Sequence, residues 1–310
     1  YLINFFQNKY NIKIIYTSFF QAFLSASLSC LFAIPFALSL YRHRNSKLIK
    51  FIVSLCGYSF VIPSILIIHS VIGIYGRNGV ANNIFNFYDA FNINSLFGLE
   101  GILVGHILLN APFATRLFFQ NLNTIPKNYI EVVNTFSLGF WCNLRKIEWP
   151  ILKQNFLSVF SIIFVLCFLS FAIVMTLGGG PSTSTMEVAI YQSALFELNF
   201  NKAIILSIIQ IIICTIFLLF SFYKLKGSNF FEIQINNFNH PFSKINRIKL
   251  FDYFIIIFFS IILFSPIIYI LLNFIQTINF ENYFMKKYFL EILKNSFILS
   301  FTTGIVVTCI

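Results

Sequence analysis

Long runs without any charged side chain are the feature that most constrains how this chain can fold. No Asp, Glu, Lys or Arg occurs in residues 14–41, 51–76 or 154–186. A helix that crosses a bilayer needs about 20 consecutive, mostly apolar residues, because each residue adds only about 1.5 Å to its length. The sequence therefore predicts an all-α fold, a polytopic transmembrane helical bundle. The seven predicted spans are residues 14–41, 51–74, 97–119, 151–177, 203–223, 252–274 and 289–310.

The overall composition excludes a soluble globular protein. Of the 310 residues, 58% are hydrophobic and 10% are charged, whereas a soluble domain carries about 25% charged residues. A transmembrane β-barrel would show alternating hydrophobicity over about 10 residues in each strand. The runs here are continuous Ile, Leu and Phe instead, so we expect helices that contact the lipid bilayer.

The net charge of +11 indicates membrane orientation better than it indicates nucleic-acid binding, and no nucleic-acid partner is expected. Basic residues cluster in every second loop, and positively charged loops stay in the cytoplasm. This alternation places the first residues of the chain on the outer side of the membrane. The clusters follow the first, third and fifth predicted spans and contain Arg42, Arg44, Lys47 and Lys50, then Lys127, Arg145, Lys146 and Lys153, then Lys224, Lys226, Lys244, Arg247 and Lys249.

A polar, basic and Asn-rich stretch divides the chain into two membrane parts. We expect residues 1–225 to form a first part that holds five of the predicted spans. Residues 226–250 are expected to be a cytoplasmic linker, and residues 251–310 to begin a second part.

The loop after the third span contains Phe, Leu, Ile and Trp, but its charges exclude a span. Pro126 favours the start of a short helix. Ser137-Leu138-Gly139 predicts a turn before a second helical stretch that runs to Ile147, and Pro150 is predicted to start the fourth span. Two interpretations fit this pattern: a cytoplasmic helix-turn-helix that a partner subunit grips, or an interfacial amphipathic helix.

Residues 126–150 resemble the EAA loop of binding-protein-dependent ABC importer permeases. Glu131 stands where that motif has its glutamate, and Pro150 stands where the motif ends, 19 residues later. Ser137 replaces the usual glycine, and Gly139 follows two residues later. Because glycine adopts a positive φ more readily than serine does, this replacement bears on the geometry of the turn.

A narrower resemblance covers about residues 16–225. The segments Ile147–Pro150, Phe164–Ala172 and Leu177–Gln192 are similar to the corresponding segments of permeases from thiamine importers. The resemblance implies the type I ABC importer permease fold, with two fused permease halves in the bacterial inner membrane. It also implies that one helix precedes the first residue and that most of the second half follows the last.

The same resemblance implies a transport subunit and not an enzyme. The expected function is import of thiamine or its phosphates into the cytoplasm, with a permease for ferric iron or another small solute as the alternative. The implied partners are two copies of a cytoplasmic ATP-binding subunit, which hydrolyses ATP, and a periplasmic thiamine-binding protein. No cofactor is expected. No metal site is predicted either, because the six cysteines form no Cys-x-x-Cys pair.

Two other classes of protein fit less well. An intramembrane enzyme would need paired catalytic groups or a zinc motif within its spans, and the sequence contains neither. A purely structural scaffold would have no need of a glutamate and a proline at the spacing of the EAA loop.

The resemblance assigns coupling with the ATP-binding subunit to the loop. Glu131, near the start of the first loop helix, would be favoured by the helix dipole and could pair with a basic residue of the partner. Phe140 and Trp141 are the expected apolar anchors, because large aromatic side chains dominate many interfaces. The predicted coupling residues are Glu131, Ser137, Gly139, Phe140, Trp141, Ile147 and Pro150.

A second set of candidates lies in the third span and toward the outer side. The run Gly178–Pro181 lacks the strand, helix and lysine of a phosphate-binding loop, so irregular backbone that lines a cavity is expected. Residues Glu187–Gln192 fit either loop packing or a periplasmic gate or docking surface, in which Tyr191 could meet a cationic thiazolium. His106 and Asn110, one turn apart, fit either translocation lining or interhelical hydrogen bonding. The predicted gate and translocation residues are His106, Asn110, Gly178, Gly179, Gly180, Pro181, Glu187, Tyr191 and Gln192.

Overall fold

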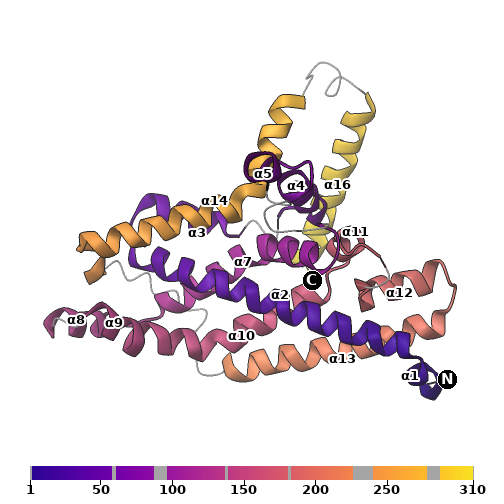
Figure 1. Cartoon of the computed structure of the whole chain (residues 1–310), viewed down its shortest axis with the longest axis horizontal. Helices are drawn as coiled ribbons and strands as arrows, with labels where there is room; N and C mark the ends of the chain where they lie inside the picture. Colours follow the sequence, from indigo (N-terminus) through magenta and orange to yellow (C-terminus); the bar gives the residue numbers. More distant parts are fainter. Residues whose placement is uncertain are drawn as a thin grey trace. The chain divides into compact units, whose positions relative to one another are not determined.

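The computed structural model describes residues 2–57, 61–86, 96–136, 139–180, 183–225, 240–277 and 287–309. These residues form helices and their connections, with no strand in any of the described ranges. The elements are α1 (Leu2–Gln7), α2 (Lys9–Arg42), α3 (Lys47–Leu55), α4 (Ser64–Tyr75), α5 (Val80–Phe85), α7 (Leu99–Asn123), α8 (Lys127–Thr135), α9 (Phe140–Asn143), the π turn η2 (Leu144–Glu148), α10 (Trp149–Phe168), α11 (Ala172–Leu177), α12 (Met186–Leu195), α13 (Phe200–Leu225), the 3-10 turn η4 (Pro241–Lys244), α14 (Asn246–Thr277) and α16 (Lys287–Cys309) (Figure 1).

The chain divides into two compact units, Tyr1–Pro266 and Ile267–Ile310. The first unit contains every residue of the candidate site described below. The linker predicted at 226–250 falls partly outside the described residues, so the division into permease halves stays a prediction.

Six helices among the described residues are long and apolar enough to cross a membrane. They confirm the polytopic helical prediction at six of the seven expected positions. The six are Lys9–Arg42, Leu99–Asn123, Phe140–Phe168, Phe200–Ser221, Asn246–Gln276 and Phe289–Thr308.

The prediction of one continuous span over residues 51–74 is wrong. The segment contains two shorter helices, α3 and α4, which end and begin on either side of Gly57 and Pro63. Proline has no backbone N–H and disfavours helical geometry at the residue before it. Pro63 is therefore suited to its place as the N-cap residue of α4, whereas α3 already ends at Leu55, with Cys56 as its C-cap.

The fourth span also differs from its prediction. Pro150 does not start a new helix, because α9, η2 and α10 form one continuous helix, Phe140–Phe168. The π turn directly precedes the proline, and the Trp149 N–H bonds to the Leu144 carbonyl. An extra residue in this turn accommodates a proline that would otherwise disrupt the regular ladder. At its other end the predicted span breaks after Phe168, and Ala172 starts the short helix α11.

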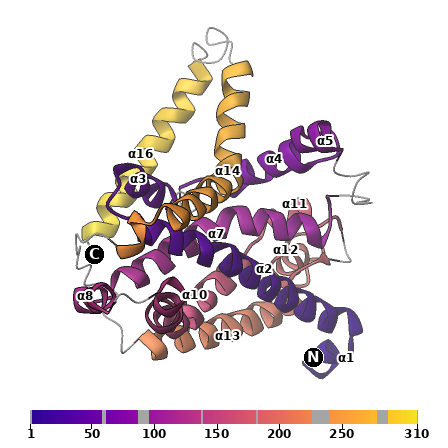
Figure 2. The same ribbon diagram turned by 60° about the vertical axis from the view of Figure 1, so that its left-hand side comes forward.

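Small residues on α2 let it lie close to its neighbours. Its main partners are α7 and α10, and α10 also packs against α13 (Figure 1, Figure 2). Without a hydrophobic driving force between helices in lipid, close backbone approach is what holds such helices together. The buried small residues of α2 are Ser18, Ala22, Ser25, Ala26, Ser29, Cys30, Ala33, Ala37 and Ser39.

We predict that Ala26→Leu destabilises the first unit. Ala26 is fully buried in the core cluster, so the added carbons must displace neighbouring side chains, at a cost of about 1–3 kcal/mol. The readout is the thermal unfolding midpoint of the complete protein in detergent. Leu31→Ala, on the exposed side of the same helix, is the matched control, and equal midpoints for both variants would contradict the packing described.

Candidate functional site

The loop between α7 and α10 presents aromatic side chains at its surface. Tyr129, Phe136 and Trp141 are 56%, 71% and 76% exposed. The loop is nevertheless anchored to the unit, because Val133 of α8 is buried in the same core cluster as Phe242 of η4. Large exposed aromatic side chains on an ordered helix are typical of a docking surface.

Glu131 lies in the middle of α8, which corrects its predicted place near the helix start. It is the fifth of nine residues, and the first turn contains no acidic residue. The favourable helix-dipole effect decays within the first turn, so it contributes little at this position. The Glu131 backbone carbonyl accepts a hydrogen bond of 2.9 Å from Thr135 Oγ1.

The turn between the two loop helices contains two of the predicted coupling residues. Ser137 lies outside the described residues. Gly139 is the N-cap of α9 with φ −65°, and a Cβ there would meet open space. Glycine is therefore not required at residue 139 by its backbone conformation.

The two predicted aromatic anchors have different surroundings. The Phe140 ring lies under the Arg42 guanidinium at 4.6 Å and contacts the edge of the Phe242 ring at 5.7 Å. Phe140 therefore packs within the chain, whereas Trp141 remains exposed. Of the other predicted coupling residues, Ile147 is buried in the core cluster and Pro150 is exposed.

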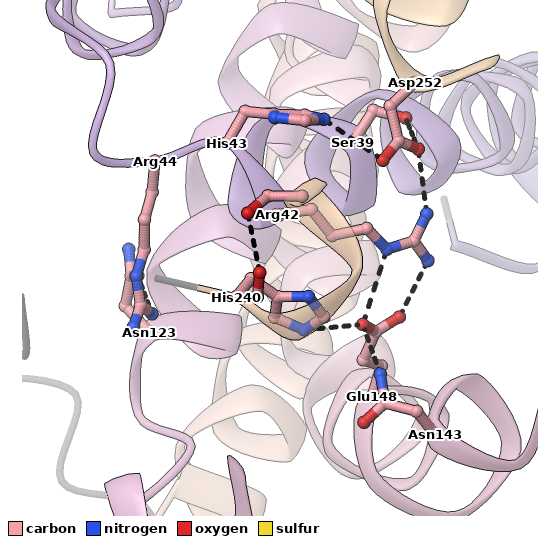
Figure 3. A network of polar contacts seen from close by, with 10 residues as sticks. Ser39, Arg42, His43, Arg44, Asn123, Asn143, Glu148, His240 and Asp252 are labelled. Atoms are coloured by element: carbon pink, nitrogen blue, oxygen red, sulfur yellow. Dashed lines mark hydrogen bonds and ion pairs between the residues drawn. The ribbon is translucent and has the colours of Figure 1, made fainter. Parts of the chain in front are cut away.

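A buried ion-pair network lies directly behind the loop (Figure 3). Arg42, at the end of α2, contacts Glu148 of η2 and Asp252 of α14. Its Nη2 is 2.9 Å from Glu148 Oε2, and its Nη1 is 2.9 Å from Asp252 Oδ1. The three side chains are 4%, 1% and 0% exposed. Charges removed from water to this degree are stable only when they are paired and hydrogen-bonded.

Histidines and small polar groups complete this network. The His43 Nε2 lies 3.3 Å from Asp252 Oδ2, and the His240 Nε2 lies 3.4 Å from Glu148 Oε1. Asn143 Nδ2 donates to Glu148 Oε1 at 2.8 Å. From here on, "the Arg42 network" means Ser39, Arg42, His43, Asn143, Glu148, His240 and Asp252.

Arg44 fastens the same end of α2 to the end of α7. Its Nη1 donates to Asn123 Oδ1 at 3.1 Å, and its guanidinium lies 4.9 Å from the Tyr41 ring centre. Burial lowers the pKa of the Arg44 guanidinium from its usual value, while Tyr41 acts in the opposite direction. Arginine titrates so far above neutral pH that Arg44 keeps its charge.

The sequence did not predict the Arg42 network. In the sequence, Arg42 and Arg44 indicate only the orientation of the chain in the membrane, and Glu148 is part of the resemblance at residues 147–150. One available signal was the position of Arg42, Glu148 and Asp252, because each lies at the cytoplasmic end of a predicted span. Opposite charges at the same membrane depth can pair when their helices are neighbours.

The two polar candidates of the third span make interhelical contacts. His106 is fully buried, and its Nδ1 lies 3.0 Å from Ser25 Oγ of α2. Asn110 Nδ2 donates to Cys167 Sγ of α10 at 3.2 Å. These are the contacts expected from the hydrogen-bonding alternative, and a role in translocation stays a prediction.

The glycine run ends α11 beside the start of α7. Gly179 and Gly180 have φ values of 69° and 121°, which only glycine adopts without strain. The Gly98 N–H donates to the Leu177 carbonyl at 2.8 Å, and Thr183 Oγ1 donates to the Gly178 carbonyl. Irregular backbone is present at Gly179 and Gly180, whereas Gly178 keeps helical geometry as the C-cap of α11. The role of the run in lining a transport cavity stays a prediction, and Pro181 lies outside the described residues.

A pocket of about 190 Å³ adjoins this glycine run. Gln192 of α12 contributes to its wall, whereas Glu187 accepts a hydrogen bond of 2.5 Å from Gln210 Nε2 of α13. The Tyr191 ring packs at 5.0 Å from Phe171 and 5.7 Å from Phe196. The pocket is lined by Tyr10, Val174, Met175, Gly180, Thr183, Ser184, Val188 and Gln192. Among the described residues, no cluster of His, Cys, Asp and Glu could hold a metal ion.

Comparison with known proteins places the chain among transport permeases. Residues 32–228 match the family model of the binding-protein-dependent transport system inner membrane component. The chain is 35% identical over 277 residues to the thiamine transport system permease protein ThiP of Haemophilus influenzae, covering 88% of this chain and 50% of that protein. It is 35% identical over 208 residues to ThiP of Escherichia coli, covering 67% and 39%.

Solved structures support the same fold at lower identity. A bacterial ABC transporter for import of the acidic polysaccharide alginate aligns with a TM-score of 0.57 and 16% identity, over 74% of this chain and 83% of that chain. The MetNI methionine ABC transporter in an inward-facing conformation aligns with a TM-score of 0.55 and 16% identity, over 71% and 98%.

The chain spans half of the length of its Haemophilus influenzae relative and less of the Escherichia coli one. The family match covers residues 32–228 and includes the loop, Arg42 and Glu148. On this match, the chain belongs to the family of binding-protein-dependent transport system inner membrane components, the membrane-embedded permeases of bacterial ABC importers.

Proposed function

We propose that this chain is part of the membrane subunit of an ATP-driven importer that carries thiamine or its phosphates into the cytoplasm. The observation that carries the proposal is the 35% identity to a thiamine transport permease over 88% of the chain. Relatives of this kind share their substrate class more often than proteins that share only a fold.

We propose that the loop at 126–150 is the contact with a cytoplasmic ATP-binding subunit. The support is its exposed Trp141, Phe136 and Tyr129, together with its place at the cytoplasmic end indicated by the basic loops. Two copies of this subunit and a periplasmic thiamine-binding protein complete the proposed importer. A related alginate transporter has been solved in complex with its sugar-bound periplasmic protein, with 15% identity and a TM-score of 0.55.

The proposed mechanism follows from the continuous helix Phe140–Phe168. Its first turn carries Trp141 at the surface, and its remainder runs through the unit beside α2 and α7. A push on the loop when the ATP-binding subunits close would therefore move the whole helix. Such movement would shift the permease between inward-open and outward-open states. The free energy of this shift cannot exceed the difference in free energy with which ATP binds to the two states.

The outer pocket is the proposed place of substrate entry. Irregular backbone at Gly179 and Gly180 and the side chain of Gln192 border it. Tyr191 and Glu187 are proposed to support this region through their contacts with neighbouring helices. His106 and Asn110 are proposed to lie along the path between this pocket and the cytoplasmic end.

We expect the complete gene, expressed with its ATP-binding subunit and binding protein, to restore uptake of labelled thiamine in cells that require thiamine. Unlabelled thiamine, its monophosphate, its diphosphate and ferric iron are added in separate experiments as competitors in large excess. Energy-dependent uptake of labelled thiamine supports the proposal, and stronger competition by a phosphate than by unlabelled thiamine identifies that phosphate as the preferred form. Absence of energy-dependent thiamine uptake despite normal membrane levels of the permease would contradict the proposal, as would uptake of labelled ferric iron in place of thiamine.

A further inference from the structure

The Arg42 guanidinium joins three segments that are distant along the chain, and Glu148 adds a fourth. Arg42 ends α2, Glu148 ends the π turn of the loop, and Asp252 lies near the start of α14 (Figure 3). His240, which immediately precedes η4, adds the fourth segment through its contact with Glu148. These contacts span 106 residues between Arg42 and Glu148 and 210 residues between Arg42 and Asp252.

We propose that Arg42, His240 and Asp252 are positioning residues that fasten the start of α14 to the second helix of the loop, so that both move as one body. The inference rests on the proposed function, because it says how movement of the loop would be transmitted to α14. Arg42 can transmit this movement because its two Nη atoms bind different carboxylates, each at 2.9 Å.

The charges explain why this connection resists separation. Arg42 carries one positive charge, and Glu148 and Asp252 carry two negative charges between them. The Nε2 atoms of His43 and His240 lie 3.3 Å and 3.4 Å from the Asp252 and Glu148 carboxylates, respectively. Pulling α14 away from the loop would leave a buried carboxylate or guanidinium without its partner, which is strongly unfavourable.

The shape of the loop helix makes the connection mechanical. Glu148 sits on the continuous helix Phe140–Phe168, seven residues after the exposed Trp141. Asn143, one turn before Glu148 in the same helix, donates a hydrogen bond to the Glu148 carboxylate. The Phe140 ring packs against the Arg42 guanidinium. The surface that is proposed to meet the ATP-binding subunit and the ion pair to α14 therefore belong to one rigid element.

The first test measures coupling in the full-length permease, reconstituted with its ATP-binding subunit and binding protein. For Asp252→Asn we expect normal assembly and basal ATP hydrolysis, but the amount of thiamine transported per ATP hydrolysed should fall about fivefold or more relative to the native protein. Asp252→Glu should recover part of this loss. If transport and ATP hydrolysis instead fall in parallel with the yield of assembled complex, the network is only structural and the proposal is overturned.

The second test does not depend on the substrate. Nitroxide labels replace the exposed Lys153 of α10 and Leu250 of α14, in a background without other reactive cysteines. The distance between the labels should stay the same in nucleotide-free and ATP-bound complexes of the native network, and should change between these states in Asp252→Asn. A change of distance in the native network would overturn the proposal.

His240→Gln serves where Asp252→Asn does not assemble, because it leaves both carboxylates and Arg42 in place, and the same two results are expected of it. Failure of the proposed function is recognised separately. In that case the native protein itself accumulates no thiamine, while the label distances still decide whether the loop and α14 move together.

Discussion

Replacing Glu131 with arginine in the complete importer is expected to abolish the association of the permease with its ATP-binding subunit. Glu131 is an exposed carboxylate on α8, on the loop that also presents Tyr129, Phe136 and Trp141. Reversal of its charge opposite a basic residue costs about 2–5 kcal/mol. That cost corresponds to a loss of roughly 30-fold or more in affinity. The measurement is co-purification of the ATP-binding subunit, followed by uptake of labelled thiamine.

The matched control is Glu197→Arg. Glu197 is also an exposed glutamate, and it pairs with Lys202 at 3.0 Å in the connection between α12 and α13. A pair whose Glu197 partner is 48% exposed contributes about 1 kcal/mol, and the alternation of basic loops predicts that this connection lies on the opposite side of the membrane from the loop. We expect Glu197→Arg to keep the ATP-binding subunit bound. Equal binding by both variants would remove Glu131 from the interface.

Replacing Arg42 with methionine is expected to have the largest effect on stability. The substitution keeps a long apolar side chain but leaves Glu148 and Asp252 buried without their cation. Removal of one partner from a buried ion pair costs about 3–5 kcal/mol. The expected result is a clear fall in the thermal unfolding midpoint of the complete protein in detergent, followed by loss of helical circular dichroism.

Two variants show whether charge causes this loss. Lys50→Met removes an exposed cation from α3 and should change stability by less than about 0.5 kcal/mol. Adding Glu148→Gln and Asp252→Asn to Arg42→Met removes the uncompensated carboxylates and should recover most of the lost stability, since apolar or neutral replacements of whole buried ion groups are well tolerated. If the triple variant is no more stable than Arg42→Met, packing and not charge explains the loss.

The membrane-spanning helices could be predicted from the sequence because the bilayer imposes a strict requirement. Every backbone polar group in lipid must bond within its own helix, so 20 or more uncharged residues leave few other structures. The residues where helices break were harder to predict. Pro63 lies at the N-cap of a new helix within one expected span, whereas Pro150 continues a helix, because a π turn at Leu144–Glu148 accommodates it. That difference arises from the local hydrogen-bond pattern, which the presence of a proline alone does not determine.

The loop could be located from its spacing, but the contacts behind it could not be predicted. Glu131 and Pro150 lie in one short segment, so their separation along the chain is informative. Arg42 and Asp252 are 210 residues apart, and they meet only because α2 and α14 are neighbours in the folded unit. The sequence likewise does not show that Phe140 packs inside the chain, so it predicts an anchor for the partner there. The contact of Phe140 with Arg42 depends on tertiary packing that its sequence neighbours do not indicate.

If ATP hydrolysis drives import through the loop at 126–150, Trp141 must contact the ATP-binding subunit. A photoreactive benzoylphenylalanine at Trp141 of the complete permease, in membranes that also contain the ATP-binding subunit, measures this contact. The matched position is Leu219, which is 63% exposed on α13. The account predicts an adduct with the ATP-binding subunit from residue 141 and none from residue 219. Absence of the adduct from residue 141 in a permease that still imports its substrate would contradict it.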